Sequence, residues 1–107
     1  MYLKIICGSM FFNIEGDDKK IEKEIDDKIA NVEIDRFDKE FEDYSINFDV
    51  EIATESKYFT HILNIYGFVK NNDYCIDTQN KLENILKEVF RDYKIIKSFI
   101  DCKNKDD

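Results

Sequence analysis

Hydrophobic and polar positions change their spacing several times along the chain, and each change predicts a new element. Residues 2–14 are apolar at odd and even positions alike, which is typical of a strand buried on both faces. In residues 17–30, isoleucines recur at every fourth position from Ile21 to Ile29, which predicts a helix. Asp17 stands where this helix begins and is a candidate N-cap, because its carboxylate can accept hydrogen bonds from the first turn.

The clearest strand pattern lies in the middle of the chain. Apolar and polar residues alternate from Tyr44 to Ile52, and a second apolar run covers residues 58–70. Pairing the two runs as a hairpin, with Ile52 opposite Phe59, puts both apolar sets on one side of the sheet. A slip of one residue would turn one of these sets into water, so the pattern favours this hairpin.

The last third of the chain predicts the strongest helix and a final strand. Apolar residues at helical spacing run from Leu82 to Tyr93, and Asp77 or Thr78 is expected to cap this helix. Residues 94–101 are apolar on both sides, which favours a short central strand over an extension of the helix.

The segment between the first helix and the hairpin fits two patterns. The spacing of Ile34, Phe37 and Phe41 is helical, whereas the segment begins with the alternation of a strand. A short helix over 35–43 is the preferred interpretation.

These elements together predict one small α+β domain covering residues 1–107, with residues 102–107 as a frayed tail. The order β-α-β-β-α-β matches the split-βαβ, ferredoxin-like arrangement, in which helices cover one face of an antiparallel sheet. The chain is 43% hydrophobic and contains nine Phe and six Tyr, which excludes a disordered acidic polypeptide. The fold class alone implies no particular function.

Cysteine usage and hydropathy bear on the compartment. The three cysteines, Cys7, Cys75 and Cys102, are odd in number and widely spaced, so we expect free thiols in a reducing cytoplasm. No run approaches the roughly 20 apolar residues that span a bilayer, and the N-terminus is better explained as a first strand than as a targeting segment. Abundant Ile, Asn and Lys beside only two Arg are typical of an AT-rich genome.

Motifs for catalysis or cofactor binding are missing from the sequence. The single histidine, His61, falls on the apolar side of its predicted strand, where a structural role is the ordinary outcome. The three glycines stand alone at positions 8, 16 and 67, so no phosphate-binding loop can form. Zinc-ligand spacing and calcium-loop spacing are also missing. We therefore expect a protein that is not an enzyme and holds no cofactor or metal.

Charge is distributed unevenly along the chain, whose formal net charge is −8. Residues 15–43 contain 13 acidic and six basic residues, whereas the other 78 contain 11 and 10. On the predicted helices, acidic residues stack in rows with few bases between them. The candidate partner-binding residues are Asp18, Glu22, Asp26, Asp27, Asp35, Asp38, Glu42 and Asp43.

This acidic segment predicts a non-enzymatic inhibitor that occupies a basic, nucleic-acid-binding surface of a target protein such as an effector or a nuclease. Phage anti-defence (anti-CRISPR-like) proteins and immunity proteins against nuclease toxins work in this way. Direct nucleic-acid binding is disfavoured, because phosphates attract a basic patch. The plain alternative is a solvated face that maintains solubility.

Two other function classes stay open. One is a homo-oligomeric scaffold or accessory subunit that pairs through Ile62, Tyr66 and Phe68, which lie opposite the core face of their strand. The other is a small-ligand-binding domain in which tyrosines, His61 and a cysteine line a pocket.

Overall fold

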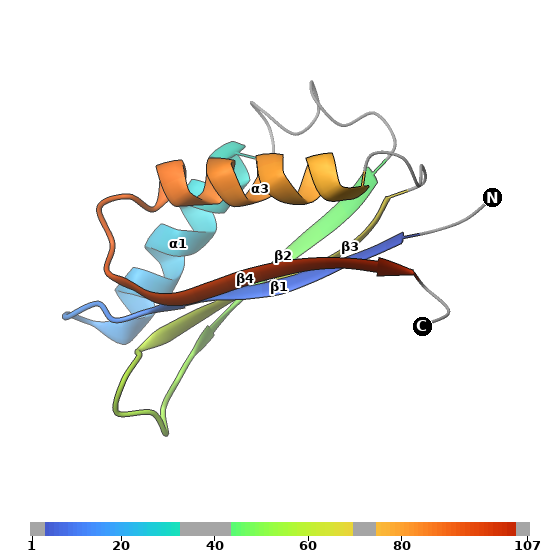
Figure 1. Cartoon of the computed structure of the whole chain (residues 1–107). Helices are drawn as coiled ribbons and strands as arrows, with labels where there is room; N and C mark the ends of the chain where they lie inside the picture. Colours follow the sequence, from blue (N-terminus) through green and yellow to red (C-terminus); the bar gives the residue numbers. More distant parts are fainter. Residues whose placement is uncertain (1–3, 33–43, 70–74, 105–107) are drawn as a thin grey trace.

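Four strands and two helices make up the described part of the chain, which comprises residues 4–32, 44–69 and 75–104 of the computed structural model (Figure 1). In chain order the elements are β1 (Lys4–Phe12), α1 (Asp18–Val32), β2 (Tyr44–Ile52), β3 (His61–Val69), α3 (Cys75–Val89) and β4 (Ile95–Asn104).

The strands form one antiparallel sheet in the order β2-β3-β1-β4, so β2 and β4 are its two edges. Both helices lie on the same face of this sheet, with α1 packed against β2 and α3 packed against β4 and β1 (Figure 1). This confirms the predicted small α+β domain with helices on one face. The ferredoxin-like assignment stays a prediction, because residues 33–43, including the predicted helix 35–43, lie outside the described residues.

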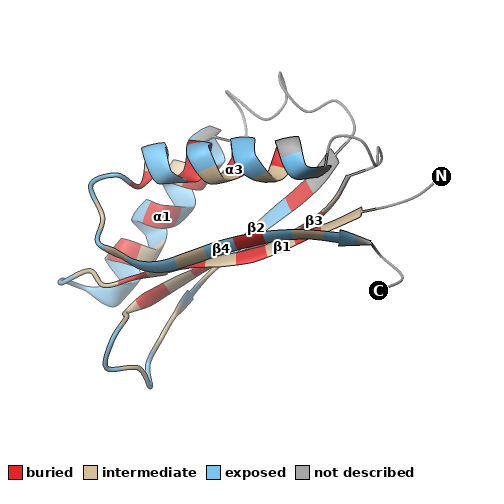
Figure 2. Ribbon diagram, viewed as in Figure 1, coloured by how far each residue is buried: buried red, intermediate tan, exposed pale blue. Residues whose placement is uncertain are grey.

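The core lies between the sheet and the helices, where Figure 2 shows the buried residues. Each buried side chain of this size contributes roughly 1.5–3 kcal/mol by its removal from water. The strands contribute alternate residues and the helices contribute one stripe each, as the sequence predicts. The buried hydrophobic residues are Ile6, Met10, Phe12, Ile21, Ile25, Ile29, Ile46, Leu63, Ile65, Leu82, Ile85, Leu86, Phe90 and Ile100.

The turn into α1 is fixed by Gly16 and Asp17. Gly16 has a φ of +138°, a backbone conformation that residues other than glycine rarely adopt. Asp17 Oδ1 then accepts hydrogen bonds from the backbone N–H groups of Lys19 and Lys20 at 3.1 and 3.0 Å. The predicted N-cap is therefore confirmed, and it satisfies two of the amides that a helix start leaves unpaired.

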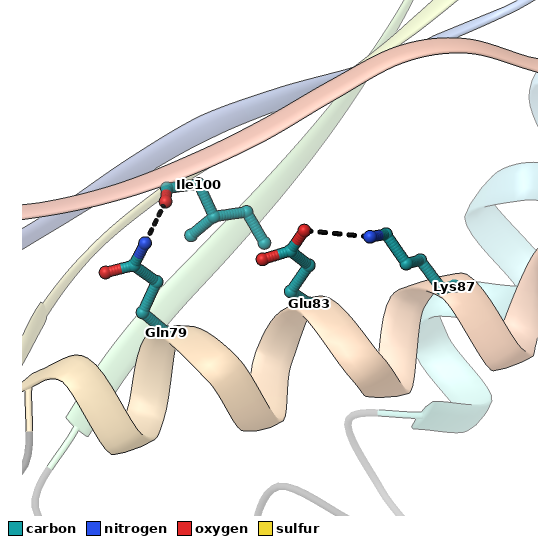
Figure 3. Close-up of polar contacts among 4 residues, drawn as sticks. All are labelled: Gln79, Glu83, Lys87 and Ile100. Carbon is teal, nitrogen blue, oxygen red and sulfur yellow. Dashed lines mark hydrogen bonds and ion pairs between the residues drawn. The ribbon is translucent and has the colours of Figure 1, made fainter.

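Helix α3 begins earlier than its apolar stripe. It starts at Cys75, so the predicted caps Asp77 and Thr78 lie inside the first turn and that prediction is wrong. The buried apolar stripe could not show this start, because the first turn of α3 lies partly outside the stripe, with Ile76 exposed to solvent. Over β4, the Gln79 side-chain amide donates a hydrogen bond to the Ile100 carbonyl at 2.6 Å, and an ion pair joins two further α3 residues, Glu83 and Lys87 (Figure 3).

The β2–β3 hairpin has the predicted faces but a different register. Ile52 pairs with His61 rather than with Phe59, so the predicted register is wrong by two residues. A shift of two residues keeps every side chain on its face, which is why the apolar pattern did not reveal it. The longer loop has a local cause, because the Ser56 hydroxyl accepts a hydrogen bond from the Phe59 N–H at 3.3 Å and turns the chain before the strand begins.

Strand β4 is an edge strand and not the predicted central one. Its apolar residues divide between the faces, since Ile100 is buried whereas Phe99 and Ile96 are exposed. Phe99 and Ile100 differ by the alternation of the strand, whereas a register shift between Phe11 and Phe12 leaves Ile96 without a Cα partner on β1. The strand continues to Asn104, so the first half of the predicted frayed tail is paired with β1; residues 105–107 lie outside the described part.

The cysteines differ from the expectation of three free thiols. Cys7 is free, whereas Cys102 is disulfide-bonded, and the side chain of Cys75 lies outside the described residues. Sequence spacing could not show this, because disulfide formation depends on distance in the fold. Since disulfides persist mainly in oxidising compartments, the cytoplasmic expectation loses the support that it drew from the cysteines. No helix among the described residues is long and apolar enough to cross a membrane.

Candidate functional site

Helix α1 carries an acidic row composed of Asp18, Glu22 and Asp26. These residues lie four apart, so they follow one flank of the helix beside the buried isoleucines. The other flank faces the end of α3, where the Tyr93 hydroxyl donates a hydrogen bond to Glu24 Oε2 at 3.2 Å. The acidic row therefore points away from α3, on the side of the edge strand β2.

The structure brings together part of the predicted partner-binding set. Asp18 and Asp26 are exposed and Glu22 is half-buried. Asp27 is exposed as well, but it lies about 100° further round the helix, on the side away from the sheet. The other four predicted residues lie outside the described part of the chain: Asp35, Asp38, Glu42 and Asp43.

The charge of α1 itself is nearly balanced. The helix holds five acidic and four basic residues, whereas residues 33–43 hold six acidic and two basic ones. Most of the negative charge counted over residues 15–43 therefore belongs to residues outside the described part. Within α1, the acidic row is an asymmetry between flanks rather than a property of the whole helix.

Sequence reasoning missed two acidic residues, Asp49 and Glu51. Both are exposed on the edge strand β2, on the face opposite the helices. The alternating pattern places them on a polar strand face, but only the strand order shows that β2 is an edge strand beneath α1. The edge of the molecule formed by α1 and β2, called the acidic edge below, thus carries acids on both sides of the sheet.

The face of the sheet opposite the helices, called the open face below, is covered by no described element (Figures 1 and 2). Its central strands β3 and β1 contribute aromatic and aliphatic side chains. Tyr66 is 49% exposed, while Ile62 and Phe68 are half-buried. The prediction that these three residues lie opposite the core is confirmed by their position.

Side chains of the open face contact one another along and across the strands. The Tyr66 and Phe68 rings meet edge to face at 5.4 Å between centroids. The Ser9 hydroxyl donates a hydrogen bond to Asn64 Oδ1 at 2.9 Å, which joins β1 to β3. Such contacts hold the side chains of this face in a defined arrangement.

His61 is fully buried and has both ring nitrogens in hydrogen bonds. Its Nε2 lies 2.9 Å from the Asp18 carbonyl oxygen, which can only accept, so Nε2 carries the hydrogen. Nδ1 lies 2.8 Å from the Thr60 hydroxyl. These bonds tie β3 to the first turn of α1 and leave the imidazole no nitrogen for a ligand. His61 therefore does not support the hypothesis of a small-ligand-binding pocket.

Within the described part of the chain, no group of three or more His, Cys, Asp or Glu residues is placed to hold a metal ion. Comparisons with known proteins gave no match, neither to a family model, nor to a curated protein, nor to a solved structure. Among the described residues, the acidic edge stands out by its charge and the open face by its exposed apolar side chains.

Proposed function

We propose that this protein is a non-enzymatic inhibitor that binds a target protein through its acidic edge. The observation that supports this proposal is the acidic row of α1, which points away from α3, together with Asp49 and Glu51 on the strand below. The target presents a basic surface, such as the nucleic-acid-binding surface of an effector or a nuclease. Phage anti-defence proteins of the anti-CRISPR kind and toxin-immunity proteins are the inhibitors that this proposal includes.

A row of like charges has a cost that a basic partner removes. Acidic neighbours four residues apart destabilise a helix by roughly 0.2–0.5 kcal/mol per pair. Lysines or arginines of a partner reverse the sign of this interaction. Because the charges are exposed, their field reaches about 8 Å at physiological salt and mainly accelerates association. The proposal therefore predicts binding whose association rate falls steeply as salt is added.

The test compares two variants with the same change of charge. Glu22→Lys with Asp26→Lys reverses two members of the acidic row and leaves Asp18, whose acidic side chain stabilises the first turn. The control, Glu55→Lys with Asp92→Lys, reverses two exposed acids outside that row. A target captured from the source cell and identified by mass spectrometry supplies the ligand for association kinetics.

We expect the row variant to associate about tenfold more slowly at low salt, with the difference shrinking as salt rises. The control should change the rate much less. Circular dichroism establishes that both variants are folded. Equal association rates for the row variant and the unmodified protein would refute the acidic edge as the binding surface.

A further inference from the structure

The open face has the size of a protein interface and apolar residues on its central strands. Four strands about 4.8 Å apart, each rising about 3.3 Å per residue over nine residues, give a footprint of roughly 600 Å² before side-chain relief is added. A standard interface buries about 800 Å² on each partner. Its two central strands carry apolar pairs toward their ends, Ile62 beside Phe11 and Phe68 beside Ile5. The polar pair Ser9 and Asn64 lies between them.

The two edges of the open face carry opposite charges. Asp49 and Glu51 lie on β2, whereas Lys97 and Lys103 lie on β4 with Asp101 between them. Counting all five, the face is close to neutral and has no basic patch, so nucleic acid is a poor occupant. A surface that is acidic at one edge and basic at the other is instead complementary to a reversed copy of itself.

Symmetry decides how two copies can meet. When two open faces pack against each other as an isologous dimer, the two-fold axis lies in the plane between them. An axis across the strands would place β2 over β2 and β4 over β4, so that each edge strand stacks on a copy of itself. An axis parallel to the strands places β2 of one copy over β4 of the other and β3 over β1. Only the parallel axis brings the acidic edge strand over the basic one.

The cross-strand register makes this arrangement complementary in one end row of the face. One row across the four strands consists of Glu51 on β2, Ile62 on β3, Phe11 on β1 and Lys97 on β4. A parallel axis reverses each row over itself, so Glu51 faces Lys97 of the other copy and Ile62 faces its Phe11. In this row, charge thus meets opposite charge at the edge strands, while apolar side chains meet on the central strands.

The neighbouring rows match on the central strands only. In the next row Asn64 faces Ser9 of the other copy, and both are polar, whereas Asp49 faces Phe99. At the far end of the face, Phe68 faces Ile5. Two twisted sheets stacked in this way lie about 10 Å apart with their strands at about 30°.

We propose that the open face binds a second copy of this chain, forming a homodimer whose two-fold axis runs parallel to the strands. This interface is separate from the acidic row of α1, which lies on the other side of the sheet. The dimer covers Asp49 and Glu51 of the acidic edge but leaves the acidic row of α1 accessible to the target of the proposed inhibitor. The two proposals therefore stand or fall by different variants.

Sedimentation velocity of the full chain, from about 1 to about 200 μM, tests the dimer directly. We expect a reversible monomer–dimer equilibrium. Tyr66→Lys puts an ammonium at the centre of the face and should raise the dimer Kd at least about tenfold. The matched control is Ile76→Lys, which changes a residue that is 69% exposed on α3 and should leave the Kd unchanged. A monomer over the whole range, or equal Kd values for Tyr66→Lys and the unmodified protein, overturns the proposal.

Charge reversal tests the direction of the axis. Glu51→Lys alone and Lys97→Glu alone should each weaken the dimer several-fold, and the two together should restore it. With the axis across the strands, Glu51 would lie over β2 of the other copy and Lys97 over its β4, so the double variant would not restore the dimer. Two single variants that weaken the dimer without restoration by the double variant therefore overturn the proposed axis. The variant with Glu22→Lys and Asp26→Lys should dimerise normally whatever it does to target binding.

Discussion

The two faces of the sheet are built from the same strands and differ in what covers them. On the helix-covered face, Ile6 and Phe12 of β1 are fully buried. On the open face, their neighbours Ile5 and Phe11 are only half-buried. Because side chains alternate along a strand, one strand serves two environments. The covered face holds the fold together, and the open face keeps apolar surface that a further contact can bury.

The comparison also explains why the chain is so apolar for its charge. A sheet with one solvated face ordinarily alternates between hydrophobic and polar residues. In this molecule β2 follows that rule, with Asn47, Asp49 and Glu51 outward, whereas β1 and β3 do not. The apolar residues are thus added on the two central strands of the open face, while its two edge strands stay charged. Apolar residues between charged margins are typical of an interface core inside a polar rim.

The largest expected effect comes from cutting side chains on the two faces of β3. Leu63→Ala removes a fully buried side chain and should lower the free energy of unfolding by about 2–5 kcal/mol. Ile62→Ala removes a half-buried side chain next to it and should cost about 1 kcal/mol or less in the monomer. Urea denaturation at low protein concentration, with unchanged m-values, measures both losses.

Equal losses at the two positions would contradict the difference in packing between the two faces, because they would mean that the open face is as well packed as the core. A larger loss for Ile62→Ala at high than at low protein concentration would support the proposed burial of the open face. Such a dependence is expected if the second copy covers Ile62 and shifts the unfolding equilibrium by mass action.

Local sequence patterns predicted the helices and strands well, but they did not predict which strands lie next to one another in the sheet. The alternation along β2 and the isoleucine stripe of α1 fixed which residues face the core, since burial requires a set of apolar residues on one side. The order of strands in the sheet has no such local signal. Strand β4 lies at an edge although its sequence is apolar on both sides. One of its apolar residues, Phe99, lies on the open face and is exposed.

The hairpin register and the disulfide depended on details outside any periodicity. The Ser56 turn lengthens the loop by local hydrogen bonds, and Cys102 is bonded because of distances in the fold. The candidate surfaces follow the same division. The acidic row could be predicted from spacing alone. The charge pattern of the open face required the strand order, which brings Glu51 and Lys97 to opposite ends of one row.

A second prediction concerns neighbours on β1, at Gly8 and Ser9. Strand β4 approaches Gly8 so closely that a Cβ there would overlap the Phe99 carbonyl oxygen and lie 2.9 Å from the Ile100 Cα. Gly8→Ala should therefore push the strands apart and cost about 1–3 kcal/mol of unfolding free energy. Ser9→Ala should cost only about 0.5–1.5 kcal/mol, because it removes one half-exposed hydrogen bond to Asn64.

Thermal or urea unfolding compares these two variants. A loss for Gly8→Ala no greater than that for Ser9→Ala would contradict the close approach of β4 to β1. It would also weaken the row alignment on which the open-face dimer depends, since β4 supplies Lys97.

The smallest expected effect depends on pH and tests how tightly the helix layer is closed over the covered face. Tyr93 packs on Phe12, with ring centroids 5.9 Å apart, and its hydroxyl donates to Glu24. Burial raises the pKa of Tyr93 above its ordinary value, and the Glu24 carboxylate raises it further. In the unfolded chain the hydroxyl ionises near pH 10, so its stabilising contribution is complete below about pH 10 and is lost as pH rises through the higher folded pKa.

Tyr93→Phe removes this ionisation from both states. The stability difference between the unmodified protein and Tyr93→Phe should therefore be fully present below about pH 10 and should shrink from about pH 10 upward. Urea denaturation across that range measures it, with Tyr66→Phe on the open face as the control that keeps Tyr93 in place. A difference that grows with pH would have the wrong sign for a buried phenol beside a carboxylate. A difference that stays constant with pH would mean that solvent reaches Tyr93 and that the contrast between the two faces is smaller than the packing indicates.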